Sequence, residues 1–306
     1  MKNTFILVAL LQLWSEASFA ACGTIAFGLT APQSTINFTS NATPSASVTV
    51  TRTGATGSCN FFIGFSKGAS GTYAPRKLFN AANFITYQLY QNAGFTNVLQ
   101  DKPDSSTATN FLSNNFTGTQ TTKTTSYFPQ RSAVTGYEYY GTYSDSISAH
   151  LYTGSITGSY TLVSTATITY QHSVPKLIDI SLVNTSAAFN IADTTQTFSF
   201  GTLNTPPPAQ SADLIIKYNA GYGVNLCSTN TGQMKHSSLA KFVPYTMTLN
   251  STSVNFATSC GTYVVTGASF NTTGVRLPMT ITPGSIGTVP SGSYSDTITV
   301  TISTTE

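Results

Sequence analysis

The sequence predicts an all-β protein made of two tandem antiparallel β-sandwich domains, and three observations support this fold class. Aromatic residues make up 12% of the chain, with 19 Phe and 16 Tyr, and together with many Thr, Val and Ile they favour half-buried strands. Short strand-like segments alternate with clusters of Gly, Asn, Pro and Ser, as in sandwich folds. Several motifs of the first half recur in the second half, and no segment has a convincing helical period.

The expected strands are β-rich or alternating segments bounded by turn residues. In the first half they are Ser47–Thr53, Asn60–Ser66, Phe84–Gln91, Tyr143–Tyr152 and Thr161–Gln171. In the second half they are Leu177–Val183, Asp213–Tyr218, Gly223–Ser228, Val243–Asn250 and Tyr294–Ser303. Alternation directs one side of each strand toward a core and the other toward solvent.

The first twenty residues have the pattern of a secretory signal peptide. Lys2 provides a positive start, Phe5–Leu13 is apolar, and Ser18–Ala20 ends a small-residue cleavage motif. The apolar run is shorter than the roughly 20 residues that span a bilayer, and no later run reaches that length. We therefore expect residues 1–20 to be removed and the remaining chain to be exported without a membrane span.

The two halves carry related motifs in the same order. The pairs are Tyr143-Ser144-Asp145-Ser146-Ile147 with Tyr294-Ser295-Asp296-Thr297-Ile298, Ile85-Thr86-Tyr87 with Val243-Pro244-Tyr245, and Phe27-Gly28 with Phe200-Gly201. Pro175 disfavours helix and interrupts a strand ladder, so the boundary is expected near it. The sequence thus predicts an N-terminal domain over residues 21–172 and a C-terminal domain over residues 173–306.

The four cysteines lie as one pair in each half, namely Cys22, Cys59, Cys227 and Cys260. Export places them in an oxidising compartment, where disulfides are the default. Of the three possible connectivities, we favour the two local pairs, Cys22–Cys59 and Cys227–Cys260. A metal site is the alternative, but no Cys or His spacing of the zinc type is present.

Residues that could support catalysis are few. The histidines are His150, His172 and His236, and none stands in a metal-binding or catalytic motif, so a structural or surface role is expected. The run Gly154–Gly158 has Ile where a nucleophile elbow requires Ser. Asp145 and Asp296 start equivalent strands, which favours turn capping over an acid–base pair. We expect no enzyme activity, cofactor or metal, and because the net charge of +3 is scattered we expect no nucleic-acid partner.

The two halves differ after their shared Tyr-Ser-Asp strand. The first half continues through Thr153–Ser159 into another strand, whereas the second half has no strand after Tyr294–Ser303. We therefore expect the second domain to be one strand short. An incomplete sandwich exposes unpaired backbone groups, and a strand inserted from another chain would complete it.

The first half also carries a characteristic set of residues between Cys59 and Asp101. These are Cys59, the apolar strand Phe61–Phe65, the Gly/Ser-rich turn Gly68–Gly71, Arg76 and Tyr87-Gln88-Leu89-Tyr90, with a closing motif at Gly141–Asp145 and again at Gly292–Asp296. This pattern resembles the spore coat protein U domain family. The stretch Lys102–Gln130 and the position of Cys227, which follows Asp213–Tyr218, depart from it.

Domains of this family are similar to subunits of archaic chaperone–usher pili, with immunoglobulin-like, pilin-like sandwiches. A two-domain member resembles their tip adhesin. The resemblance implies a periplasmic chaperone, an outer-membrane usher and an adjacent pilin as partners, export through the periplasm to the pilus tip, and a role in surface attachment and biofilm formation. Cys22 follows the expected cleavage site almost at once, after Ala21, and leaves no room for a donor extension, which also favours the tip.

Loops 54–58, 92–107 and 153–159 are expected at the end of the first domain that lies away from the linker. Phe95, Val98, Leu99 and Ile156 are the candidate adhesive residues there, because exposed apolar loop residues suggest a binding surface. The alternative is that Val98 and Leu99 form a short buried strand. Tyr137, Tyr139 and Tyr140 are a second aromatic candidate at the linker end.

Two other functions remain open from the sequence. A structural spore-coat or cell-surface matrix protein could share the fold, and it would be favoured by a polymer-forming terminal extension. A secreted lectin-like or hydrolytic protein would be favoured by a polar pocket with converging carboxylates. Neither feature is visible in the sequence.

Overall fold

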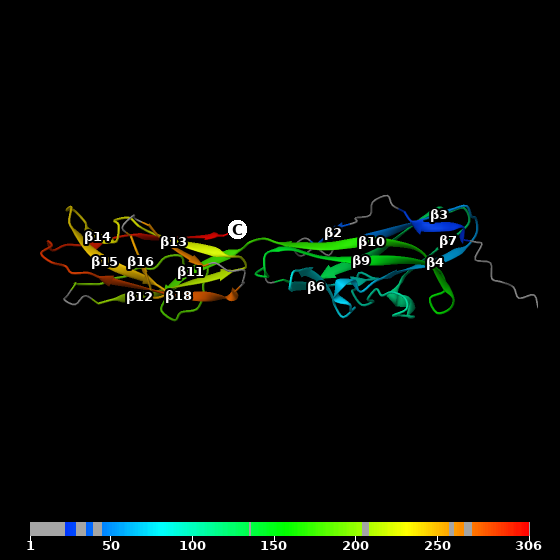
Figure 1. Ribbon diagram of the computed structural model, residues 1–306, viewed down its shortest axis with the longest axis horizontal. Helices are drawn as coiled ribbons and strands as arrows, with labels where there is room; N and C mark the ends of the chain where they lie inside the picture. The colour runs from blue at the N-terminus through cyan, green and yellow to red at the C-terminus, as the bar shows by residue number, and fades with distance from the viewer. Residues whose placement is uncertain are drawn as a thin grey trace, which may run out of the picture. The chain divides into compact units, whose positions relative to one another are not determined.

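The computed structural model describes residues 22–28, 35–38, 45–134, 136–203, 208–256, 260–265 and 271–305, so the expected signal peptide lies outside the described residues. The chain forms two compact units, both built almost entirely of strands (Figure 1). Unit 1 contains the described residues up to Ser132 together with Tyr143–His172. Unit 2 contains Ala133–Thr142 and the residues from Ser173 onward. Among the described residues, no helix has the length and apolar character needed to cross a membrane.

Unit 1 is a sandwich of two five-stranded layers. In order across the first layer, the strands are β1 (Thr24–Phe27), β3 (Ala46–Thr53), β8 (Thr122–Arg131), β6 (Asn83–Tyr90) and β5 (Arg76–Asn80). Across the second layer they are β7 (Leu112–Phe116), β4 (Cys59–Phe65), β9 (Gly141–Gly154), β10 (Tyr160–Val174) and β2 (Thr35–Asn37). A single residue pair, Phe79 with Ser144, joins the two layers.

Aromatic rings fill the space between the layers of unit 1. Tyr87 on β6 lies 5.3 Å from Tyr170 on β10, and Phe65 on β4 lies 5.1 Å from Tyr127 on β8, measured between ring centroids. The hydroxyls of Tyr127 and Tyr170 are hydrogen-bonded at 2.7 Å, so these buried polar groups satisfy each other. β-branched and aromatic residues therefore form both the strands and the core, as the composition predicts.

Unit 2 has the same layered plan with fewer strands in one layer. Its larger layer contains β11 (Ile178–Asn184), β12 (Gln210–Tyr218), β18 (Asn271–Pro283), β15 (Phe242–Leu249), β14 (Gln233–His236) and β19 (Tyr294–Ser295), with β16 (Thr252–Val254) beside β15. In its smaller layer the described strands are β17 (Cys260–Val265), β13 (Tyr222–Ser228) and β20 (Ile298–Thr304).

The strand orders show that the two units repeat one fold. The order β1-β3-β8-β6-β5 of unit 1 corresponds to β11-β12-β18-β15-β14 of unit 2, and β7-β4-β9 corresponds to β17-β13-β20. Two of the sequence matches fall on corresponding strands. The third match is wrong, because Phe27 lies on β1 whereas Phe200 lies between β11 and β12, outside any strand. Among the described strands of unit 2, none corresponds to β10.

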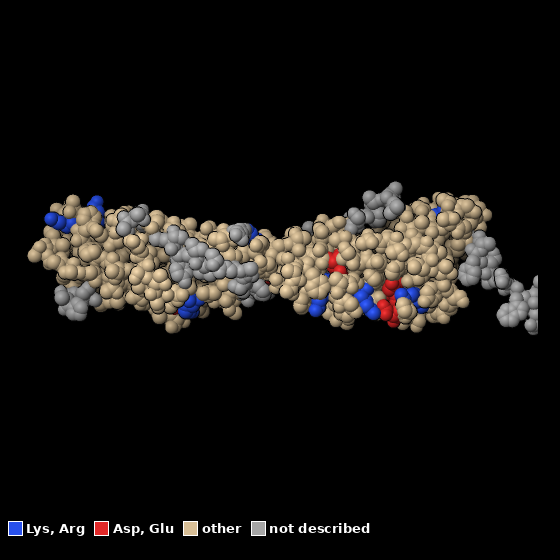
Figure 2. Space-filling view, in the orientation of Figure 1, with Lys and Arg blue, Asp and Glu red and all other residues tan. Residues whose placement is uncertain are grey.

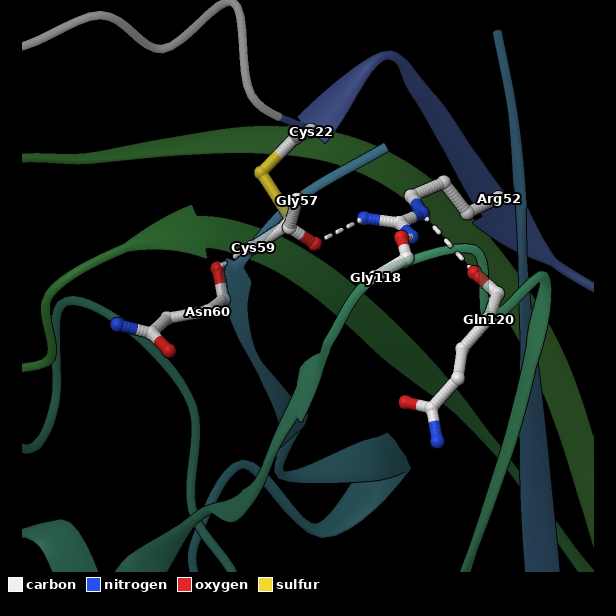
Figure 3. Close-up of a disulfide and its surroundings, with 7 residues drawn as sticks. All are labelled: Cys22, Arg52, Gly57, Cys59, Asn60, Gly118 and Gln120. Carbon is white, nitrogen blue, oxygen red and sulfur yellow. Dashed lines mark hydrogen bonds between the residues drawn. A yellow bond between two sulfur atoms is a disulfide. The ribbon is translucent and has the colours of Figure 1, made fainter. Parts of the chain in front are cut away.

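Each unit contains one disulfide within itself. Cys22 is bonded to Cys59, the first residue of β4, and Cys227 on β13 is bonded to Cys260 on β17. These are the two local pairs. Beside the first disulfide, the buried guanidinium of Arg52 donates hydrogen bonds to the carbonyls of Gly57, Gly118 and Gln120 (Figure 3).

Candidate functional site

A tyrosine–aspartate hydrogen bond recurs at equivalent places in the two units. In unit 1 the Asp145 carboxylate accepts from the Tyr87 hydroxyl at 2.7 Å, and in unit 2 Asp296 accepts from Tyr245 at 2.6 Å. Each carboxylate also accepts a backbone N–H from the turn that follows β4 or β13, at 2.9 and 3.0 Å. Burial raises the pKa of both tyrosines. The aspartates thus cap turns and join strands.

This repeated bond aligns β9 residue by residue with β19 and β20. The inward-facing residues of β9 are Tyr143, Asp145, Ile147, Ala149 and Leu151, and each is at most 3% exposed. Their counterparts are Tyr294, Asp296, Ile298, Val300 and Ile302, and all five are only half-buried. The same positions of one fold are therefore covered in unit 1 and uncovered in unit 2.

The difference arises because β10 lies beside β9 in unit 1. Ile168, Tyr170 and Val174 of β10 are buried, and they face inward next to β9. In unit 2 the described strands leave β20 at the edge of its layer, paired with β13 alone. An edge of this kind presents unpaired backbone groups.

The backbone hydrogen bonds between β20 and β13 show which backbone groups of β20 point away from β13. Thr305 N–H donates to the Gly221 carbonyl, and Thr229 N–H donates to the Thr297 carbonyl, so the odd-numbered residues point toward β13. Backbone direction alternates along an antiparallel strand. The N–H and C=O groups of Ile298, Val300 and Ile302 therefore point away from β13, while the side chains of the same residues face the core.

A second set of half-buried apolar residues lies on β11, the edge strand of the other layer. Ile178, Ile180 and Leu182 are paired with the core residues Tyr218, Ile216 and Leu214 of β12, so they face the core of unit 2. We call β11 and β20, with the apolar residues that they turn toward the core, the open flank of unit 2. It can accept both side chains and backbone hydrogen bonds from an added strand.

At the end of unit 1 away from Val174, two of the three expected loops lie together. Thr153 is paired with Phe61, near Cys59, so the β9–β10 turn and loop 54–58 share this end, as Figure 1 shows for the turn. Arg52 ties loop 54–58 to the 117–120 turn (Figure 3). Ile156 packs against the small cluster of Phe62, Phe111 and Tyr152.

The first part of the third loop, which carries Phe95 and Val98, begins away from this end. Tyr90 is paired with Phe128, whereas β8 extends six residues further, to Thr122, which is about 20 Å at the usual rise per residue. Phe95 packs on Tyr90 at 5.4 Å between ring centroids, and Val98 forms a bridge with the same residue. Phe95 and Val98 therefore lie on the flank of unit 1, whereas Lys102 of the same loop reaches the end and donates to the Ile156 carbonyl.

Leu99 is a correction to the expected adhesive surface, because it is fully buried. Its N–H donates to the Leu89 carbonyl, and its own carbonyl accepts from the buried Arg76 guanidinium. Val98 is half-buried beside it. The alternative of a short buried strand therefore fits Leu99 in its burial, whereas Val98 forms an isolated bridge with Tyr90 rather than part of a strand.

The second aromatic candidate belongs to unit 2. Tyr137, Tyr139 and Tyr140 lie in the segment Ala133–Thr142, which joins that unit, and all three are half-buried. The Tyr137 hydroxyl donates to Asp179, and the Tyr140 N–H donates to the Asn219 carbonyl. These rings cover part of unit 2 rather than the end of unit 1.

The sequence missed the most exposed apolar side chains at the end of unit 1. They are Tyr160, Leu162 and Val163 at the start of β10, which are 40%, 50% and 40% exposed. The Tyr160 ring lies 5.5 Å from that of Tyr152, next to Ile156. The sequence over 160–171 alternates regularly, and such alternation predicts that one side of the strand is buried along its whole length. It therefore gives no sign that the start of this strand is exposed. We call Ile156, Tyr160, Leu162 and Val163 the apolar end of unit 1.

The histidines are all held within the fold. His150 is hydrogen-bonded to the buried Asp101, which also accepts from Tyr152, and His172 is bonded to the Phe38 carbonyl. His236 accepts from two backbone N–H groups of the turn after β14. Charged side chains occupy a small part of the face in Figure 2. No cluster of three metal-ligating side chains occurs in the described part of the chain.

Solved structures with a similar arrangement of strands include pilus adhesins. They include the CsuC–CsuE chaperone–tip adhesion subunit complex of archaic chaperone–usher Csu pili from Acinetobacter baumannii (12% identity, 88% of this chain and 96% of that chain, TM-score 0.40). Another is the CupB6 tip adhesin from Pseudomonas aeruginosa (12% identity, 90% and 93%, TM-score 0.42). A third is a mutant of the CfaE adhesin of enterotoxigenic E. coli (11% identity, 89% and 76%, TM-score 0.37). No curated protein matches the chain.

A family model matches the N-terminal part of the chain. The match covers residues 3–150 and is to the Spore Coat Protein U domain. It includes the motif residues between Cys59 and Asp101 and the closing motif at Gly141–Asp145. Domains of this family are structural and non-enzymatic. Residues 3–150 of this chain therefore match the Spore Coat Protein U domain family.

Proposed function

We propose that this protein is a pilus tip adhesin, in which unit 1 attaches to a surface and unit 2 joins the fibre by accepting a strand from the next subunit. The observation that carries the proposal is the contrast between two copies of one fold. Five inward-facing positions are buried beside β10 in unit 1 and half-exposed in unit 2, where no described strand takes that place.

Strand insertion fits the open flank better than a further packing layer would. The free edge of β20 offers backbone groups at the same three residues whose side chains face the core. An added strand would satisfy those groups and cover Ile298, Val300 and Ile302 together, which is the mode of donor-strand complementation. During export the same flank needs protection, so a periplasmic chaperone and an outer-membrane usher would act before the adjacent pilin does.

A structural coat or matrix protein is the second candidate, since the family name itself refers to a coat. The apolar end of unit 1 favours the adhesin. Exposed apolar side chains gathered at the start of β10, next to the β9–β10 turn, form a surface suited to binding. We propose that attachment by this surface supports biofilm formation.

Replacing Val300 with proline tests strand insertion. The Val300 N–H points away from β13, and proline is tolerated on an edge strand when its missing N–H faces outward. We expect Val300→Pro to leave the fold intact but to lower the amount of the chain assembled on the cell surface at least tenfold, measured by immunoblotting of whole producing cells and of sheared surface fibres.

Val300→Ala is the control, because it removes more of the apolar side chain than proline does but keeps the N–H. It should assemble at close to the normal level. Normal surface assembly of Val300→Pro, with its fold verified by circular dichroism, would contradict insertion beside β20.

Replacing Leu162 and Val163 together with serine tests attachment. Covering the exposed part of each side chain contributes roughly 1 kcal/mol, so losing both should weaken binding about 20- to 30-fold. The measurement is binding of the purified full chain to alkylated and to bare glass. Ile191→Ser, at a residue of unit 2 that is 60% exposed, is the control and should bind normally. A loss caused instead by Phe95→Ser would place the binding surface on the flank.

A further inference from the structure

The chain segment between β1 and β3 of unit 1 differs from the corresponding segment between β11 and β12 of unit 2. In unit 1 it contains β2, which pairs in parallel with residues Thr169–Gln171 of β10. The Phe38 N–H donates to the Gln171 carbonyl at 2.7 Å and continues this ladder. β2 therefore lies on the side of β10 opposite to β9, and β10 is held between the two.

In unit 2 the corresponding segment follows β11 and includes residues 194–203. Asp193 lies beside β11 on the edge that points away from β12, because its carbonyl accepts from the Leu182 N–H at 2.7 Å. Gln196 then donates to the side chain of Asn184 at 2.8 Å, so the chain runs alongside β11. Residues 194–203 belong to none of the described strands.

This segment nevertheless has the pattern of a strand. Thr197 and Ser199 are exposed, whereas Phe198 and Phe200 are half-buried and pack against the core of unit 2. Thr35-Ile36-Asn37-Phe38 of unit 1 has the same alternation, but Ile36 and Phe38 are each only 3% exposed. The segment thus presents a strand-like side to the core without a neighbouring strand to pair with.

We infer that Thr197–Phe200 forms a strand when unit 2 accepts its partner, pairing in parallel with the incoming strand while β20 pairs with it in antiparallel. The inference rests on the proposed function. It adds Thr197–Phe200 to the site as a second strand, a second wall that contacts the incoming strand on the side opposite to β20. The incoming strand takes the place of β10, and Phe198 and Phe200 close over it as Ile36 and Phe38 close over β10.

The register of β10 against β9 predicts the side chains that the incoming strand must carry. Ser146 lies opposite Thr169 and Thr142 opposite Ser173, with hydroxyl separations of 3.2 and 3.4 Å. In this register the inward partners of Asp145 and Ile147 are Tyr170 and Ile168, and those of Ala149 and Leu151 are Ala166 and Ser164. The partner strand therefore carries large apolar residues opposite Asp296 and Ile298, and small residues opposite Val300 and Ile302.

A graft of the chain's own strand provides the test. Thr305 of unit 2 corresponds to Gly154 of unit 1, so a copy of residues 155–174 appended to the full chain after Thr305 places the β9–β10 turn and β10 in register with β20. Amide hydrogen exchange is then compared with that of the ungrafted chain. We expect exchange to slow at least tenfold at Ile298–Thr304 and also at Thr197–Phe200.

The two possible failures are distinguishable. Protection of Ile298–Thr304 without protection of Thr197–Phe200 would overturn the inference and leave strand insertion beside β20 intact. Protection of neither segment would overturn the proposed function and the inference together.

Substitution of Phe198 and Phe200 provides a second test. Phe198→Ser with Phe200→Ser should raise the exchange rate of β20 at least tenfold in the grafted chain, and much less in the ungrafted chain, because the rings become fully buried only around the added strand. Phe242→Ser, at a residue of unit 2 that is 39% exposed, is the control and should act equally in both chains. An equal effect of the double variant with and without the graft would contradict the second wall.

Discussion

Replacing Arg76 with methionine is expected to lower the free energy of unfolding of unit 1 by about 3–5 kcal/mol, because it leaves several buried acceptors unpaired. Arg76 is fully buried and donates to the carbonyls of Phe65, Ser66 and Leu99 at 2.9–3.0 Å, and to the side chain of Gln88. Methionine fills most of the volume but donates nothing, so the carbonyls lose their partners without regaining water.

Urea unfolding of the full chain, followed by circular dichroism, measures this effect in the transition assigned to unit 1. Lys77→Met is the matched control. Lys77 is a half-buried cation of the same strand whose ammonium lies 3.9 Å from the centre of the Phe84 ring, and its loss should change stability by less than 1 kcal/mol. A change of less than 1 kcal/mol for Arg76→Met as well would show that water or another donor replaces the guanidinium.

Local pattern was sufficient to predict many of the strands. Ser47–Thr53, Phe84–Gln91 and Leu177–Val183 agree with β3, β6 and β11 to within one residue at each end. These segments alternate strongly or are rich in β-branched and aromatic residues, so propensity and burial favour the same conformation. The Thr/Asn/Ser-rich stretch Lys102–Gln130 contains β7 and most of β8, and neither strand is among those expected from the sequence. Small polar residues carry little apolar contrast between the two sides of such strands.

The position of the proposed binding surface could not be predicted in the same way. Assigning Phe95 and Leu99 to the end of unit 1 required the pairing register of β6 with β8, which local sequence does not contain. The same limit applies to Tyr137, whose return to unit 2 depends on a bond to Asp179, 42 positions along the chain. The duplicated motif, in contrast, allowed one unit to serve as a template for the other, and it directed attention to β10, which has no counterpart among the described strands of unit 2.

Grafting the copy of residues 155–174 after Thr305 is also expected to stabilise unit 2 by about 3 kcal/mol. Two inserted large side chains and the uncovered parts of Ile298, Val300 and Ile302 would leave water, at roughly 1.5–3 kcal/mol per fully buried side chain, and ordering the added strand offsets part of this gain. A stabilisation of this size corresponds to a rise of about 10 °C in the midpoint of thermal unfolding. A graft whose copy carries Ile168→Ser and Tyr170→Ser is the control, and it should add the backbone without the apolar contacts.

The midpoint of thermal unfolding of unit 2, measured by calorimetry on the full chain with and without this graft, tests most directly whether unit 2 lacks a strand. The account predicts that the unit 2 transition moves up by about 10 °C with the graft and much less with its serine control, while the unit 1 transition stays in place. An unchanged unit 2 transition, with the grafted segment cleaved rapidly by protease, would show that unit 2 is complete without a partner and would contradict assembly by strand insertion.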